Sequence, residues 1–105
     1  MIKHIVAWRL KDSAHGLDKA ATAQAIKQKL EGLRGRIPGL QKLEVGIDFS
    51  ATDASSDVVL CTTFPDRAAL DAYQVHPEHQ AVAAYIRAAA SERRLIDYEV
   101  PDPRQ

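Results

Sequence analysis

Alternation between apolar and polar side chains predicts four strands in this chain. In Ile2–Leu10 both alternating faces carry apolar residues, which predicts a central strand covered on both sides. Leu40–Phe49 is apolar on one face only, which is typical of an edge strand or of a strand with one wet face. The nearly continuous apolar run Val58–Phe64 predicts another central strand, and Arg93–Val100 predicts the fourth.

Helical spacing of apolar residues fills the intervals between these strands. Asp18 is the expected cap of a first helix that runs to Ile37, where Pro38-Gly39 stops it. Asp66 is the expected cap of a second helix, which breaks at His76 because the residue before a proline is pushed out of helical geometry. Pro77 then begins a further helix, in whose first turn its missing N–H costs nothing.

The order of these elements is β-α-β-β-α-β, with the interrupted helix counted once. Right-handed connections then give an α+β, ferredoxin-like domain with a four-stranded antiparallel sheet and the helices on one face. We expect one domain over residues 1–105, with a polar tail at 101–105. Because the first strand is apolar on both faces, one apolar sheet face stays uncovered, which predicts a homodimer packed sheet to sheet.

Composition removes several classes of function. The chain has 14 Lys and Arg against 14 Asp and Glu, so it has no basic field for nucleic acid and no polybasic run for a membrane surface. Its single cysteine, Cys61, excludes an intrachain disulfide and is expected to be a buried thiol. The start of the sequence lacks a signal-peptide pattern and no stretch has membrane-spanning length, so we expect a cytoplasmic protein.

The candidate chemistry lies in Tyr73–His79, which holds two of the four histidines. His79 follows Pro77 in a first helical turn, where the helix dipole keeps an imidazole neutral, so it is the candidate general base. Tyr73 is a candidate catalytic donor to an enolate. His4, Trp8 and His76 are candidate substrate-binding residues. In the competing interpretation His76 only caps the helix, and His79 only satisfies a buried carbonyl.

Other sites are weaker alternatives. His76 and His79 with His4 or His15 would supply three nitrogens for a metal, but Pro77 disturbs their spacing, and we predict no metal site and no cofactor. Gly32–Gly35 ends a helix, so it does not form a phosphate-binding loop. Asp97 and Glu99 are expected to pair with basic residues at a sheet edge: Lys3, Arg93 or Arg94.

Three stretches together resemble a known family. The start Ile2–Val6, the His-Pro-x-His pattern within Tyr73–His79 and the ending Asp97–Glu99 are similar to the stress-responsive dimeric α/β-barrel (Dabb) family, over about Met1 to Val100. The resemblance implies a ferredoxin-like subunit, a barrel formed across a dimer, and no redox cofactor. Most bacterial members have no established activity.

A few plant members of that family are polyketide cyclases, which close a ring by intramolecular aldol chemistry. The resemblance implies that His79 matches their catalytic base and His4 their pocket histidine. Those cyclases also carry a tyrosine on the first helix, whereas residues 18–37 here contain no aromatic residue. Two hypotheses follow: a homodimer that binds a small apolar carbonyl-type ligand between sheet and helices, or a cofactor-independent, cyclase-like lyase with His79 as base.

Overall fold

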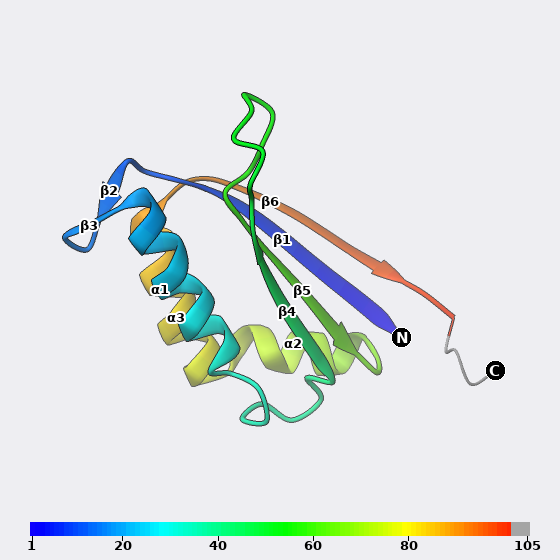
Figure 1. Ribbon diagram of the computed structural model, residues 1–105. Coiled ribbons are helices and arrows are strands. Elements are labelled where there is room, and N and C mark those ends of the chain that lie inside the picture. The colour runs from blue at the N-terminus through cyan, green and yellow to red at the C-terminus, as the bar shows by residue number, and fades with distance from the viewer. Residues whose placement is uncertain (102–105) are drawn as a thin grey trace.

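The computed structural model describes residues 1–101, which form one sheet with three helices and a small hairpin (Figure 1). The elements in chain order are β1 (Ile2–Leu10), β2 (Ser13–Ala14), β3 (Leu17–Asp18), α1 (Lys19–Glu31), β4 (Lys42–Ile47), β5 (Val58–Phe64), α2 (Arg67–Val75), α3 (Pro77–Ala89) and β6 (Ala90–Glu99). Apart from the hairpin, this is the predicted β-α-β-β-α-β order, and the second helix is interrupted at His76 as expected.

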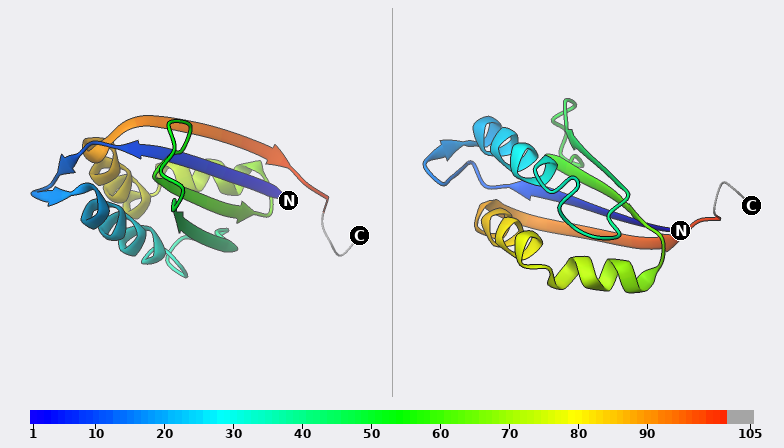
Figure 2. Two further views of the ribbon diagram at one scale, coloured as in Figure 1. Left: turned by 45° about the horizontal axis from the view of Figure 1, so that its top comes forward. Right: turned by 90° about the horizontal axis from the view of Figure 1, so that it is seen from below.

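The sheet is antiparallel throughout, with strand order β4-β5-β1-β6. The chain-adjacent strands β4 and β5 pair directly, and β1 lies between β5 and β6. The helices gather on one side of this sheet (Figures 1 and 2). The predicted ferredoxin-like α+β fold is therefore confirmed, with β1 and β5 central and β4 at an edge.

The helices cover one of the two alternating faces of β1. His4, Val6 and Trp8 are buried on the helix side, whereas the neighbouring positions Lys3, Ile5 and Ala7 are exposed or half-buried. Burial of apolar surface on the helix side is the main source of stability. The core there consists of Ile2, Val6, Trp8, Leu10, Ala23, Ile26, Leu30, Leu33, Ile37, Leu43, Val45, Val58, Leu60, Phe64, Leu70, Tyr73, Ile86 and Ala89.

The opposite sheet face, which no helix covers, carries apolar side chains, as the sequence of β1 predicts. Ile5 pairs in register with Ile96, and Lys3 with Tyr98, so these β6 residues share the uncovered face. Ile96 is 58% exposed and Tyr98 40% exposed. Half-buried Cys61 also faces this side, so its thiol is less buried than the sequence predicts. Its partial burial still raises the pKa of the thiol.

α1 and β4 both end earlier than the sequence predicts. α1 ends at Glu31 rather than Ile37, because Gly32 caps it and Gly35 adopts a positive φ of 74° that a helix does not contain. Ile37 stays buried, so turns mimic the helical spacing. β4 ends at Ile47, which leaves Phe49 97% exposed in the following loop.

The start of β6 and the segment after β1 also differ from the sequence prediction. β6 begins at Ala90, directly after α3, instead of at Arg93. The expected loop after β1 contains the two-residue strands β2 and β3, joined through His15 and Gly16, both with positive φ. Within residues 1–101, no helix is long and apolar enough to cross a membrane.

Candidate functional site

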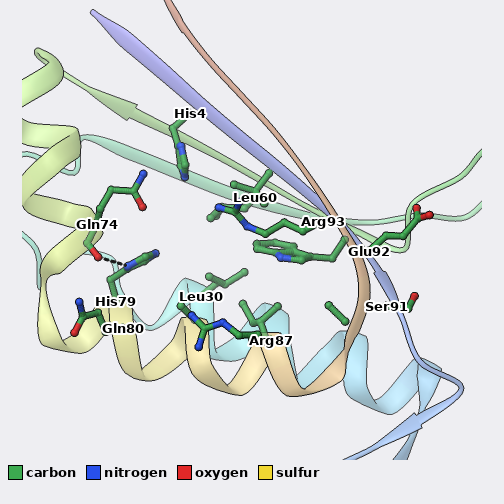
Figure 3. Close-up of a pocket in the computed structure, with 15 residues that line it drawn as sticks. His4, Leu30, Leu60, Gln74, His79, Gln80, Arg87, Ser91, Glu92 and Arg93 are labelled. Atoms are coloured by element: carbon green, nitrogen blue, oxygen red, sulfur yellow. Dashed lines mark hydrogen bonds between the residues drawn. The ribbon is translucent and has the colours of Figure 1, made fainter.

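A cavity of about 680 Å³ lies between the sheet and the helices (Figure 3). Its wall comes from β1, β5, α1, α2, α3 and the first residues of β6. The lining residues are His4, Val6, Trp8, Leu30, Leu60, Gln74, His79, Gln80, Ala83, Ile86, Arg87, Ala90, Ser91, Glu92 and Arg93. The structure thus brings together His4 and Trp8 from β1 with His79 from α3, and does not include His76 or Tyr73 in the wall.

His4 points into the cavity from β1 and is only 1% exposed (Figure 3). Its Nδ1 lies 2.5 Å from Oδ1 of Asp97, the residue directly opposite on β6. Because an ionised carboxylate only accepts hydrogen bonds, the Nδ1–H of His4 donates and the ring is held with Nε2 free of this partner. Asp97 therefore orients a cavity histidine, and the expectation that it pairs with basic residues at a sheet edge is wrong.

Glu99, two residues farther along β6, pairs with a basic residue as predicted, but its partner is Arg67. Its Oε1 lies 2.7 Å from Nε of Arg67 on α2. Both side chains are largely exposed, so this ion pair contributes little to stability. It lies outside the cavity wall.

His79 reaches the cavity because Pro77 restarts the helix. Its Nδ1 donates to the backbone carbonyl of Gln74 at 3.3 Å, which leaves Nε2 as the acceptor nitrogen (Figure 3). Burial is the largest effect on this ring and lowers its pKa; the hydrogen bond to Gln74 opposes the shift, while the charges of His4, Arg93 and His76 add to it. A neutral ring is the form a general base needs. The sequence predicts a neutral His79 from the helix dipole, whereas in the structure burial is the main cause of its lowered pKa.

Tyr73 lies in the core beside both cavity histidines rather than in the wall. Its ring centroid is 4.1 Å from that of His79 and 5.9 Å from that of His4. It is fully buried, and its hydroxyl has no hydrogen-bond partner within the described part of the chain. Burial raises the pKa of Tyr73 to about 12, so the hydroxyl keeps its proton and remains a donor.

His76 has the structural role that the sequence offered as its alternative. It is the N-cap of α3, and its Nδ1 accepts a hydrogen bond from the backbone N–H of Glu78 at 3.2 Å. Side-chain capping satisfies one of the free amides at a helix start. His76 lies outside the cavity wall, so its position gives no support to the predicted substrate-binding role.

The histidines do not gather as a metal site. His15 stacks on Tyr85 with ring centroids 3.8 Å apart, and its Nε2 bonds the carbonyl of the same residue at 2.9 Å. Among residues 1–101, no group of three or more His, Cys, Asp or Glu side chains is placed to hold a metal ion. The three-nitrogen alternative therefore has no support in the geometry.

Several polar residues of the wall were not anticipated from the sequence. Arg87 and Gln80 lie on α3, Gln74 lies in the last turn of α2, and Arg93 lies in β6. The sequence offers one sign of the position of Arg93: in a strand it shares a face with Asp97, four residues on. In the structure Arg93 also lies opposite Trp8 on β1. The strand pairing that reveals this position is set by tertiary structure.

Solved structures with the same fold include dimeric proteins of unknown function and enzymes. A dimeric ferredoxin-like protein of unknown function from Bacteroides fragilis matches with 27% identity and a TM-score of 0.82, over 94% of this chain and 95% of the other. A dimeric ferredoxin-like protein of unknown function from Jannaschia sp. CCS1 matches with 28% identity and a TM-score of 0.72, over 94% and 98% of the two chains.

The hydroxynitrile lyase of Passiflora edulis is more distant in sequence. It shares 17% identity, with a TM-score of 0.79, over 96% of this chain and 94% of that one, and shows the fold alone. A comparison with curated proteins finds no match. A family model described as the stress responsive A/B barrel domain (Dabb) matches residues 2–100, so the chain belongs to the Dabb family.

Proposed function

We propose that this chain is a homodimeric protein that binds a small carbonyl-type ligand in the cavity of each subunit. The observation that carries the proposal is the pair of imidazoles, His4 and His79, that reach one cavity from different elements. Each ring has its Nδ1 occupied, by Asp97 and by the Gln74 carbonyl, so each is held in place with Nε2 available. Apolar side chains such as Trp8 and Leu60 complete a wall suited to an organic ligand.

The uncovered sheet face supports the proposed dimer. Ile5, Ile96 and Tyr98 lie on the face that no helix covers, and exposed apolar surface of this kind is typical of an interface. The related structures from Bacteroides fragilis and Jannaschia are dimeric. Packing two such faces about a two-fold axis would bury this surface in both subunits.

A second candidate function is a cofactor-independent lyase of the polyketide-cyclase kind. The observation that favours it is the lowered pKa of His79, which keeps its imidazole neutral beside the cavity. Nε2 of His79 would take a proton from a carbon next to a carbonyl, and the enolate would attack a second carbonyl of the same substrate. The resulting alkoxide takes the proton back from His79. Tyr73 is the predicted donor to the enolate oxygen, and His4 the group that orients the carbonyl.

A binding screen with aryl ketones and polyketide-like carbonyl compounds tests the binding function. We expect compounds that bind the wild-type protein to lose affinity for His79→Ala. His15→Ala removes an exposed imidazole outside the cavity and is the matched control, for which affinity should be unchanged. Unchanged binding to His79→Ala, with only stability altered, would contradict the proposal and favour a structural role.

The lyase alternative needs a readout of proton removal. Exchange of the methyl protons of acetophenone for deuterium in heavy water, followed by proton NMR, reports a base acting next to a carbonyl. The lyase function predicts exchange above the buffer rate for the wild-type protein and buffer rate for His79→Gln. Binding of the ketone without faster exchange would leave the binding function standing alone.

A further inference from the structure

Two arginines of the cavity wall carry charges that the described protein does not neutralise. Arg93 reaches into the cavity from β6, and Arg87 lies along it on α3 (Figure 3). Within residues 1–101, no carboxylate lies within ion-pairing distance of either guanidinium, whereas Arg9, Arg34, Arg36, Arg67 and Arg94 each have such a partner.

The acidic residue of the wall does not compensate them. Glu92 points away from the cavity in Figure 3 and lies 3.7 Å from Arg9 and 3.8 Å from Arg94, on the other side of the strand. Besides the two histidines and Trp8, the remaining polar side chains of the wall are uncharged: the amides of Gln74 and Gln80 and the hydroxyl of Ser91. The cavity is therefore cationic at one part of its wall and apolar at another, in a chain with a formal net charge of zero.

We propose that the ligand of this cavity is an oxo acid, whose carboxylate binds Arg93 and Arg87 while its carbonyl group faces His4 and His79. This inference rests on the proposed carbonyl-binding function and names its ligand class. A planar guanidinium presents paired N–H donors that match the two oxygens of a carboxylate. The charge of Arg93 also contributes to the lowered pKa of His79, so Arg93 acts on the same space as the imidazole.

Two carboxylates of β6, Asp97 and Glu99, share the strand face of Arg93. Glu99 is paired with Arg67 on α2, which leaves Asp97 as the nearer one. Asp97 is engaged by Nδ1 of His4 at 2.5 Å. These two contacts leave Arg93 to an incoming anion. The two arginines that form the proposed anion site and the two imidazoles thus line the same cavity. An acid whose carbonyl lies a few bonds from its carboxylate would place an enolisable carbon beside His79.

A matched pair of probes separates charge from shape. The acid 4-oxo-4-phenylbutanoate and its amide, 4-oxo-4-phenylbutanamide, share the aryl ketone and differ in the carboxylate. We expect calorimetric titration to give at least about tenfold tighter binding of the acid to the wild-type protein, the range of a charge-assisted hydrogen bond. Added salt should reduce that preference, because it screens a partly exposed ion pair.

Substitution assigns the preference to the cavity arginines. Arg93→Gln should lose most of the preference for the acid and keep its affinity for the amide, and Arg93→Lys should keep part of the preference. Arg67→Gln is the matched control: it removes the same charge from an exposed position outside the cavity wall and should bind like the wild-type protein. Thermal melts of all variants check that each one folds.

The outcomes distinguish this inference from the function on which it rests. Equal binding of acid and amide to the wild-type protein, or an acid preference that survives Arg93→Gln combined with Arg87→Gln, would overturn the oxo-acid assignment and leave carbonyl binding intact. Failure of both probes, together with failure of every neutral ketone, would overturn both.

Discussion

The imidazole of His4 and the carboxylate of Asp97 meet across β1 and β6, with Nδ1 2.5 Å from Oδ1, although 93 residues separate them in the chain. His4 is almost fully buried, whereas the Asp97 side chain is 35% exposed. The pair therefore links the inner wall of the cavity to the edge strand of the sheet. It orients one of the two imidazoles on which the proposed function depends.

Loss of the Asp97 carboxylate should destabilise the fold through His4. Asp97→Ala leaves a buried N–H donor without a partner, so we expect the free energy of unfolding in urea to fall by about 1–3 kcal/mol. Glu99→Gln, which disrupts the exposed pair with Arg67, should cost no more than about 1 kcal/mol. If Asp97→Ala is as mild as Glu99→Gln, or equally costly when His4 is already replaced by Phe, the contact does not hold the ring.

The burial of His79 predicts a pH dependence of stability. Its pKa is lowered in the folded state, so between that pKa and the ordinary value of 6.5 the unfolded chain binds more protons. Stability contributed by the neutral ring is then present above pH 6.5 and is lost as the pH falls below it. We expect the melting temperature of the wild-type protein to fall more from pH 8 to pH 5 than that of His79→Gln. Identical pH profiles for the two proteins would contradict the burial of this ring.

His76 should act as a helix cap without a role in ligand binding. His76→Ala removes the acceptor for the Glu78 amide, and we expect a loss of about 1 kcal/mol in unfolding free energy. His76→Ser restores a capping oxygen and should recover most of that stability. Both variants should bind the aryl ketone probes like the wild-type protein; weakened binding to the stable serine variant would return His76 to the cavity.

The buried hydroxyl of Tyr73 separates stability from function. Because this hydroxyl has no partner among the described residues, Tyr73→Phe should raise the free energy of unfolding by about 1 kcal/mol. If Tyr73 is the predicted donor to a ligand, the same variant should bind carbonyl probes more weakly. Urea unfolding and calorimetric titration of one protein sample measure both effects. A stabilised variant with unchanged affinity would make Tyr73 a core residue only.

A charge on the uncovered sheet face should prevent dimerisation. Ile96→Glu places a carboxylate in the proposed interface of each subunit, where the loss of apolar burial costs about 2 kcal/mol per side chain before repulsion is added. Light scattering at micromolar concentration should give a dimer for the wild-type protein and a monomer for the variant. Val75→Glu, an exposed apolar position on α2, is the control and should stay dimeric. A monomeric wild-type protein would refute the dimer.

The sequence alone determined the order of the elements, the ferredoxin-like fold and the places of His4 and His79. Period-two patterns identify a strand such as β1, and Pro77 marks the helix break locally, so neither inference needs a distant contact. The same local reasoning failed at the end of α1. There the turns that bury Ile37 keep apolar residues at helical spacing, although Gly32 has already capped the helix and Gly35 has a positive φ.

Tertiary structure decided which distant residues meet. The alternation in β6 shows that Asp97 and Arg93 share a face, but the register against β1 sets Asp97 opposite His4 and Arg93 opposite Trp8. A shift of one residue would turn both side chains to the other face of the sheet. The cavity, its anchored imidazoles and its unpaired arginines therefore depend on a strand pairing between the two ends of the domain.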